Sequence, residues 1–318
     1  MAKPGTESAP PPNIILILTD QHRGDCVGLD GHPAVQTPNL DWLGRSGTFF
    51  QRGYSECPSC IPARRVLMSG QSPAVNGMVG MQGNVEFDPP HTLAGELRGA
   101  GYQTEMIGKL HLHPALKRYG FDHMQLADGT RGEPNDYMSW LRRQGINDMP
   151  DPGMAHGLSS NGWIGRPHHL PEELTHTFWC FSRALDFLDS RDPTCPFFLN
   201  ISMIDPHPPL APPRHYYDRY ISRDLPEPVV GDWAEEMGFT RGHDPNAQHI
   251  RLDAEQMQCS RAAYYGMINF IDDQIGRLLQ GLRDRGLSRG PFILFTSDHG
   301  AMLGHHNLFR KTYASEAF

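Results

Sequence analysis

Residues 13–21 read Asn13-Ile-Ile-Leu-Ile-Leu-Thr-Asp20-Gln21, and this stretch decides the fold. Its consecutive aliphatic side chains, closed by polar residues, are typical of a strand buried on both faces of a parallel sheet. The run ends at Asp20, so a carboxylate stands at the carboxyl end of the predicted strand. A second strand with the same kind of ending is predicted over residues 292–296, which lead into Ser-Asp-His at residues 297–299.

The rest of the chain alternates strand-like and helix-like segments. Apolar residues at helical spacing predict a long helix over residues 254–285, which Gly286 ends. This alternation predicts an α/β fold, with a mostly parallel central sheet and helices on both faces. Residues 113–170 and 206–251 have weak periodicity and are interpreted as excursions from the scaffold. Further strands are expected at residues 48–54, 103–109 and 197–203, and further helices at residues 38–46, 63–69, 92–98 and 174–190.

Length, composition and charge narrow the class of protein. A chain of 318 residues with 38% hydrophobic composition is expected to form a single globular α/β unit. Its net charge of -8 argues against nucleic acid or an anionic membrane as a partner, because both require a basic face. The longest aliphatic run, residues 14–18, is far shorter than the roughly 20 apolar residues of a spanning helix. Residues 1–12 lack the apolar core of a secretory signal, so we expect a disordered leader and a cytoplasmic protein.

Polar side chains follow two of the predicted strands at their carboxyl ends. Asp20 and Gln21 follow the first strand, and Asp298 and His299 follow the last. The carboxyl ends of parallel strands converge where such folds bind ligands. Carboxylate, amide and imidazole groups suit a cation such as Ca²⁺, Mg²⁺ or Mn²⁺. The residues alone leave a second interpretation open, because an Asp after a strand is more often a helix cap or a turn residue.

Cys57 and Cys60 form a Cys-x-x-Cys pair within residues 57–65, Cys-Pro-Ser-Cys-Ile-Pro-Ala-Arg-Arg. A zinc half-site is a poor interpretation, because no second pair stands at a suitable spacing. A redox pair is equally poor, because the surrounding sequence is not thioredoxin-like. The third interpretation takes Cys60, Pro62 and Arg64 as one functional unit placed just before a helix, and leaves Cys57 as a packing residue.

This Cys-x-Pro-x-Arg unit resembles the signature of the formylglycine-dependent sulfatases, which belong to the alkaline phosphatase superfamily. Residues 66–70, Val-Leu-Met-Ser-Gly, resemble the usual continuation of that signature, and residues 264–276 resemble the last helix before the second metal-binding strand of the family. The resemblance extends over residues 13–318. The other blocks that stand in family order are residues 13–21, Gly108-Lys109-Leu-His111, Pro206-His207-Pro208, Ser297-Asp298-His299-Gly300 and Lys311.

The resemblance implies hydrolysis of a small anionic sulfate ester. Cys60 would be converted after translation to formylglycine (3-oxoalanine) by a formylglycine-generating enzyme, and a hydroxyl of the hydrated aldehyde would attack sulfur. One divalent metal ion would assist, with Ca²⁺ as the first choice and Mg²⁺ or Mn²⁺ as alternatives. Residues 113–170 and 206–251 would select the alcohol half of the substrate. The implied metal ligands are Asp20, Gln21, modified Cys60, Asp298 and His299.

The same resemblance assigns roles to five further side chains. Arg64 would orient the hydrated aldehyde with its fixed donor fork. Lys109 and Lys311 would neutralise the sulfate oxygens, and His207 would donate a proton to the departing alkoxide or otherwise stabilise it. His111 would take the proton of the second hydroxyl, so that sulfate is expelled and the aldehyde returns.

The chain departs from the family pattern at two places. Ala63 stands where many members have Ser, although the Cys, Pro and Arg of the signature remain. Sulfatases normally continue into more of the sheet and a small antiparallel subdomain, so residues 13–318 are expected to be a C-terminally truncated catalytic domain. Because of this truncation, one alternative is an inactive sulfatase-like protein. The other alternative is a phosphonate monoester or phosphodiester hydrolase of the same superfamily. Lys109 favours sulfate over phosphonate by comparison with the family.

Overall fold

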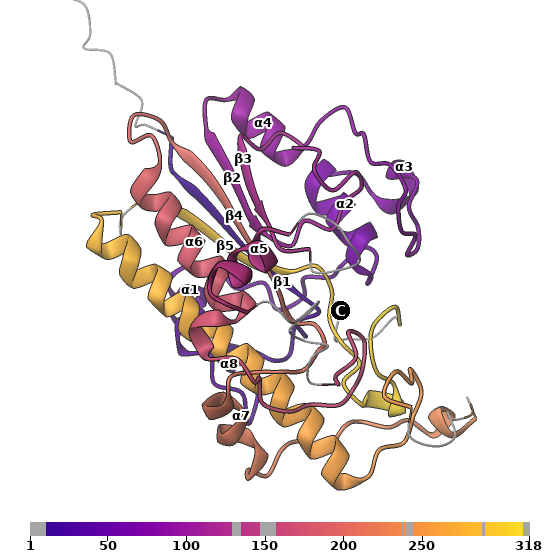
Figure 1. The fold of residues 1–318 in the computed structure, drawn as a ribbon. Coiled ribbons are helices and arrows are strands. Elements are labelled where there is room, and N and C mark those ends of the chain that lie inside the picture. Colours follow the sequence, from indigo (N-terminus) through magenta and orange to yellow (C-terminus); the bar gives the residue numbers. More distant parts are fainter. Residues whose placement is uncertain are drawn as a thin grey trace, which may run out of the picture.

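A computed structural model describes residues 11–128, 135–146, 157–236, 238, 244–287 and 290–313. The fold is built on a sheet of five strands in the order β3-β2-β4-β1-β5, and every strand pair in it is parallel. The predicted α/β class with a parallel sheet is confirmed (Figure 1). In the described part of the chain, no helix combines the length and the apolar character that a membrane span requires.

Helices alternate with the strands along the chain. The strands are β1 (Ile14–Asp20), β2 (Gln103–Gly108), β3 (His123–Leu126), β4 (Phe197–Pro206) and β5 (Phe292–Ser297). The α-helices are α1 (Pro38–Ser46), α2 (Cys60–Ser69), α3 (Pro73–Asn76), α4 (Leu93–Gly99), α5 (Asp136–Arg143), α6 (His176–Ser190), α7 (Arg214–Ile221) and α8 (Ala254–Asp284). Short 3₁₀ turns are η1 (Gly28–Asp30), η3 (Glu172–Leu174), η4 (Asp232–Glu235) and η5 (His305–Asn307).

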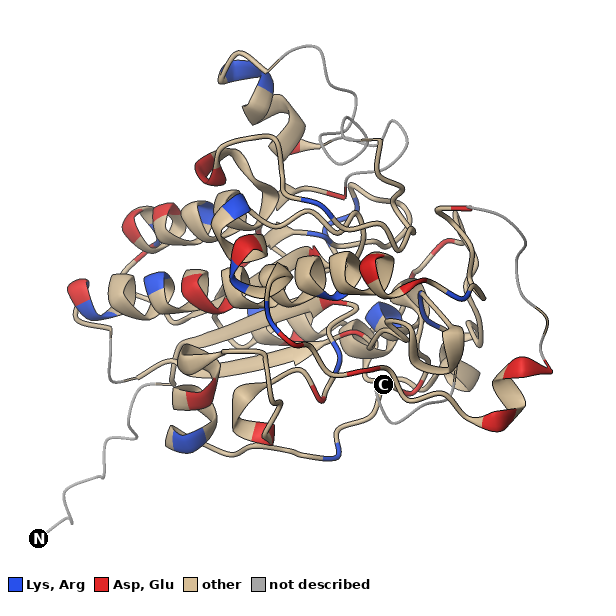
Figure 2. Cartoon of the chain, turned by 90° about the horizontal axis from the view of Figure 1, so that it is seen from below, with Lys and Arg blue, Asp and Glu red and all other residues tan. Residues whose placement is uncertain are grey.

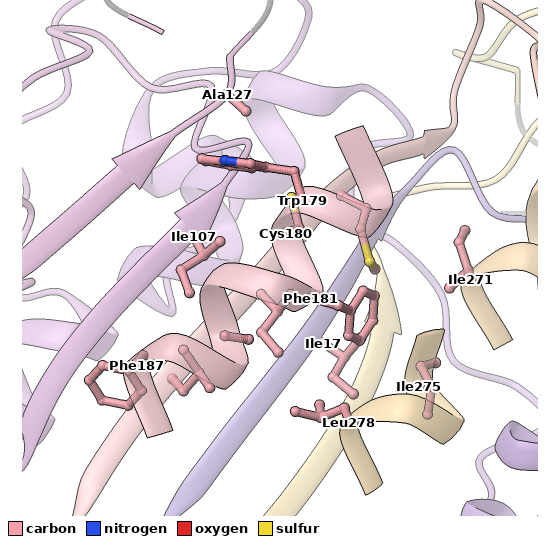
Figure 3. Packing of buried hydrophobic residues seen from close by; sticks show 14 of the residues in the cluster. Ile17, Ile107, Ala127, Trp179, Cys180, Phe181, Phe187, Ile271, Ile275 and Leu278 are labelled. Atoms are coloured by element: carbon pink, nitrogen blue, oxygen red, sulfur yellow. The ribbon is translucent and has the colours of Figure 1, made fainter. Parts of the chain in front are cut away.

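The position of β1 inside the sheet explains why its sequence is almost entirely aliphatic. Successive side chains of a strand point to opposite faces, so a strand covered on both sides needs apolar residues at every position. Ile15 and Ile17 pack into the core that contains residues of α6 and α8, part of which is drawn in Figure 3. Ile14 and Leu16 pack into the opposite core, which contains residues of α2 and α4. The predicted covering of both sheet faces by helices is therefore confirmed (Figure 1).

The long helix α8 matches its prediction to within one residue. Asp253 and Gln256 form a capping box at its start, in which each side-chain oxygen accepts a hydrogen bond from the backbone amide of the other residue. Gly286, just beyond its end, has a φ of 70°, a left-handed conformation that favours glycine. Strong signals at both ends of a helix make its boundaries predictable from sequence.

Three predicted features differ from the structure. Residues 48–54 are not a strand; Phe50 and Tyr54 lie 75% and 68% exposed, so the segment does not bury the apolar side chains on which that prediction rested. The presumed excursion over residues 113–170 contributes β3 and α5, and the one over residues 206–251 contributes α7. Cys60 is the first residue of α2 and does not precede that helix, because Ser59 takes the N-cap position.

A buried carboxylate on α8 fixes the start of α1. Asp272 accepts hydrogen bonds from the backbone amides of Asn39 at 3.1 Å and Leu40 at 2.8 Å, and from the Asn39 side-chain amide at 2.9 Å. Thr37, at the N-cap position, does not cap the helix through its side chain; its hydroxyl donates to Asp41. Asp272 therefore satisfies the amides that a cap would normally serve.

Replacing Asp272 by alanine is expected to lower the free energy of unfolding by about 3 kcal/mol, because buried donors lose their acceptor. Urea unfolding of both proteins would measure this difference. The matched control is Asp284→Ala at the end of the same helix, where an exposed carboxylate accepts a hydrogen bond from Gln280. That variant should change stability by less than about 0.5 kcal/mol. Equal effects of the two substitutions would contradict the capping role.

Candidate active site

The predicted site residues converge at the carboxyl edge of the sheet. Asp20 ends β1, Asp298 follows β5, Lys109 follows β2 and His207 follows β4. Cys60, at the start of α2, reaches the same place and lines a cavity of about 690 Å³. Parallel strands present their carboxyl ends on one side of the sheet, which explains why Gln21 and Asp298, 277 positions apart, meet there.

Four buried side chains form a compact group of potential metal ligands. Ligand atoms of Asp20, Cys60, Asp298 and His299 all lie within 4.8 Å of one another. The Cys60 Sγ atom is 3.2 Å from His299 Nε2 and 3.6 Å from Asp20 Oδ1. The Gln21 side-chain oxygen, Oε1, is buried without a hydrogen-bond partner among the described residues. A buried carbonyl oxygen without a donor fits a cation ligand, and with the carboxylates of Asp20 and Asp298 it supplies oxygen atoms that suit a hard divalent ion. The imidazole of His299 and the thiol of Cys60 are softer donors.

The His299 ring is oriented by its own backbone neighbourhood. Its Nδ1 atom lies 2.9 Å from the carbonyl oxygen of Gly300, and a carbonyl only accepts, so Nδ1 donates. The Nε2 atom therefore faces Asp20 Oδ1 at 3.4 Å and Asp298 Oδ1 at 3.6 Å. Burial opposes protonation of this ring, but the charges of Asp298, Cys60 and Asp20, with a hydrogen bond to Cys60, together raise the pKa of His299. Such a fixed ring is typical of histidines that bind metals.

Arg64 joins the two acidic strand ends. Its Nε atom donates to Asp298 Oδ2 at 2.9 Å, and one terminal nitrogen lies 3.7 Å from Asp20 Oδ2. The other terminal nitrogen donates to the Lys109 carbonyl at 2.6 Å and to Ser202 Oγ at 2.9 Å. Arg64 is buried, so these contacts hold the carboxylates of Asp20 and Asp298 in place. The terminal nitrogen that faces Asp20 is buried without a hydrogen-bond partner among the described residues, so orientation of the aldehyde by Arg64 stays a prediction.

Two lysines bring positive charge to the cavity. Lys109 Nζ pairs with Asp20 Oδ2, and Lys311 Nζ lies 2.7 Å from both Cys60 Sγ and His207 Nε2. His207 Nδ1 donates to the Pro208 carbonyl at 2.7 Å, so its Nε2 is an acceptor for Lys311. Burial, followed by the charge of Lys311, lowers the pKa of His207 well below its ordinary value. His207 is thus a neutral ring that orients Lys311.

Position 60 is an electrostatically favourable place for negative charge. Burial opposes ionisation of the Cys60 thiol, and so does Asp20, yet Lys109, His299 and Lys311 together lower its pKa. Cys60 also begins a helix of ten residues, whose N-terminus favours an anion. Elsewhere acidic and basic residues are interspersed along the helices (Figure 2). Lys109 and Lys311 therefore bring positive charge beside Cys60, where Asp20 partly offsets it, in a chain that is acidic as a whole.

His111 also lines the cavity, with an unusual backbone. Its φ is 57°, in the left-handed region that residues other than glycine seldom adopt. Burial, then the charges of Lys109 and Arg64, lowers the pKa of His111 to about 2. Its Nδ1 atom is buried and has no hydrogen-bond partner among the described residues. His111 therefore offers a neutral ring with a free nitrogen.

Sequence reasoning missed two residues that hold this site together. Ser202 lies on β4 and accepts from Arg64, and Asp128 follows β3 and binds the backbone at His111. Ser202 had no signal, because a small polar residue in a strand is unremarkable. Asp128 had a weak one, the Leu-Ala-Asp-Gly ending of a short apolar segment. Asn84 and His113, which are not among the predicted site residues, also line the cavity.

Comparisons with known proteins agree with this geometry. The sequence model of the Sulfatase family matches residues 12–317. An arylsulfatase of Clostridium perfringens is 41% identical over 94% of this chain and 65% of its own length. A multifunctional alkaline phosphatase superfamily protein, PehA of Trinickia caryophylli, is 30% identical over 96% of this chain and 66% of its own.

The fold is also similar to solved structures. The crystal structure of a phosphonate monoester hydrolase of Agrobacterium radiobacter superimposes with a TM-score of 0.80 at 26% identity, over 96% of this chain and 66% of that one. The chain thus spans about two thirds of the length of these relatives. The family match covers nearly the whole chain, and the convergent cluster around Cys60 lies within it. This chain belongs to the sulfatase family.

Proposed function

We propose that this chain hydrolyses sulfate monoesters with a formylglycine nucleophile derived from Cys60. The observation that carries the proposal is the position of Cys60, which lies between a group of potential metal ligands and the Nζ atom of Lys311. The arylsulfatase relative supports sulfate as the substrate class. A formylglycine-generating enzyme would be the partner during maturation, and the cytoplasm is the proposed location.

The residues divide the first half of the reaction between them. Asp20, Gln21, Asp298 and His299, together with residue 60, would hold the divalent ion. When bound, that ion would offset the charge of the sulfate oxygens and make a hydroxyl of residue 60 more acidic. Lys109 and Lys311 add positive charge beside the ester, and Arg64 keeps the carboxylates in place.

Departure of the alcohol requires a proton or a positive charge at the leaving oxygen. Lys311 is the better donor, because His207 is neutral and both of its ring nitrogens already have partners. His207 would then stabilise the departing alkoxide indirectly, by orienting Lys311, and would not itself donate the proton. In the second half, His111 accepts the proton of the remaining hydroxyl, the C–O bond to sulfate breaks, and the aldehyde carbonyl forms.

The alternative substrate class is a phosphonate monoester or phosphodiester. Similarity to the phosphonate monoester hydrolase and to the multifunctional PehA protein favours it. We expect kcat/KM for an aryl sulfate to exceed that for the matching aryl phosphonate monoester by at least about tenfold, a difference of ~1.4 kcal/mol in transition-state binding. Steady-state kinetics with both esters of one phenol would decide, and a preference for the phosphonate would reverse the ranking.

The proposed activity is tested with the full chain of 318 residues, expressed together with a formylglycine-generating enzyme. Mass spectrometry of the peptide that contains Cys60 would report whether the thiol has become an aldehyde. Folded, modified protein that never turns over a sulfate ester would favour an inactive relative over an enzyme. An unmodified thiol in protein from the native host would rule out the formylglycine mechanism.

A further inference from the structure

Asp128 binds the backbone of the loop that carries His111. Its Oδ1 atom accepts hydrogen bonds from the amides of Leu110 at 2.7 Å and His111 at 3.0 Å, and its Oδ2 atom accepts from His111 at 3.0 Å. The residue is only 8% exposed and lines the cavity. Strand β3, which pairs with β2, ends two residues earlier and so carries Asp128 beside the loop after β2.

The backbone of His111 needs such support. A residue other than glycine held in the left-handed region costs about 1 kcal/mol or more, and it persists only where surrounding contacts determine it. Asp128 supplies contacts to the amide of that very residue, at φ 57°. Because φ sets the direction of the side chain, the same contacts aim the free imidazole nitrogen of His111.

A purely structural role is the alternative, and the fold contains an example of it. Asp122, at the other end of β3, accepts from the Thr104 amide at 3.0 Å and the Thr104 hydroxyl at 3.1 Å, and it pairs with Arg98. Both carboxylates therefore tie the segment of β3 to that of β2. They differ in what they hold, because only Asp128 of the two lines the cavity and binds a proposed site residue.

We propose that Asp128 is a positioning residue for the second half of the reaction, in which it keeps the His111 imidazole where the sulfated enzyme breaks down. This inference rests on the proposed function. In that step, the proton of the free hydroxyl at residue 60 moves to His111. The O–H electron pair becomes the new C=O bond, and the C–O bond to sulfate breaks with its electrons leaving on sulfate.

A defect in this step has a kinetic signature of its own. When breakdown of the sulfated enzyme becomes limiting, kcat and KM fall by the same factor, and kcat/KM stays unchanged because it reports the first step. We expect a fall in kcat of about 100-fold for Asp128→Ala. Asp128→Asn keeps one acceptor oxygen, so its fall should be about tenfold. Intact-mass spectrometry during turnover should detect the sulfated protein as the main species in both variants.

The matched control is Asp122→Asn, which should keep the wild-type kcat and KM. Hydrogen exchange of the Leu110 and His111 amides gives a second readout that needs no turnover, and it should be faster in both Asp128 variants. Two results with an active wild-type enzyme would overturn the inference alone. In the first, Asp128→Ala keeps the wild-type kcat. In the second, Asp128→Ala loses kcat/KM and no sulfated protein accumulates. Modified wild-type protein without sulfatase activity would overturn the proposed function, and this inference with it.

Discussion

Replacing Cys60 by serine is expected to abolish sustained turnover, with a fall in kcat of at least about 10,000-fold. A serine has one hydroxyl, so it can take a sulfuryl group from the substrate but has no second hydroxyl whose proton loss would expel sulfate. The variant should release at most one equivalent of alcohol and then remain as a sulfate ester. Measuring alcohol release against enzyme concentration, together with the intact mass of the protein, would check both statements.

The same segment offers the control for this prediction. Cys57→Ser changes a thiol three residues earlier, whose Sγ lies 3.9 Å from the Val79 carbonyl and outside the group of potential metal ligands. Turnover of that variant should stay close to the wild-type value. Continuous turnover by Cys60→Ser would contradict the two-hydroxyl mechanism, and loss of turnover in Cys57→Ser would show that the pair acts together.

The parts of the fold that could be predicted carry strong local signals. The aliphatic run of β1 indicates a strand with two covered faces, and α8 is marked by its periodicity, its Asp253 cap and Gly286. Strand β3 has only four residues at the edge of the sheet, with two apolar side chains, which is too short for a periodic signal. Residues 48–54 have strand-like composition, yet Phe50 and Tyr54 stay exposed in the folded chain, and the local sequence pattern does not reveal this.

The candidate site was predictable in its members more than in its contacts. Every predicted site residue lies at the carboxyl edge of the sheet, because strand order places those ends together. The hydrogen bonds among them connect residues such as Lys311 and Cys60, which are 251 positions apart, and no spacing rule predicts which partner each side chain takes. The sequence therefore did not predict that Arg64 binds Asp298 or that His207 binds Lys311, and only the structure shows these contacts.

Because of these contacts, we expect loss of the metal ion to lower activity alone, whereas loss of a ligand residue lowers both activity and the free energy of unfolding. Both carboxylates among the proposed metal ligands have a cationic partner in the chain: Asp20 pairs with Lys109, and Asp298 pairs with Arg64. Without the ion, neither carboxylate is left as an uncompensated charge. Chelation of the modified enzyme should therefore lower kcat by at least about 1000-fold while the protein stays folded. Activity after dialysis against a chelator, before and after addition of Ca²⁺, Mg²⁺ or Mn²⁺, would test this.

Asp298→Ala should remove both activity and stability. The substitution takes away a proposed ligand and also the acceptor of Arg64 Nε and of the Gln21 amide, so a buried guanidinium loses its nearer carboxylate. Breaking a buried pair in this way costs about 3–5 kcal/mol of unfolding free energy, which urea unfolding would measure. Asp189→Ala, which breaks an exposed pair with Arg285, is the control and should change little. Full activity in protein shown to be free of metal would rule out the metal role, whereas a stable Asp298→Ala variant would contradict the ion pair alone.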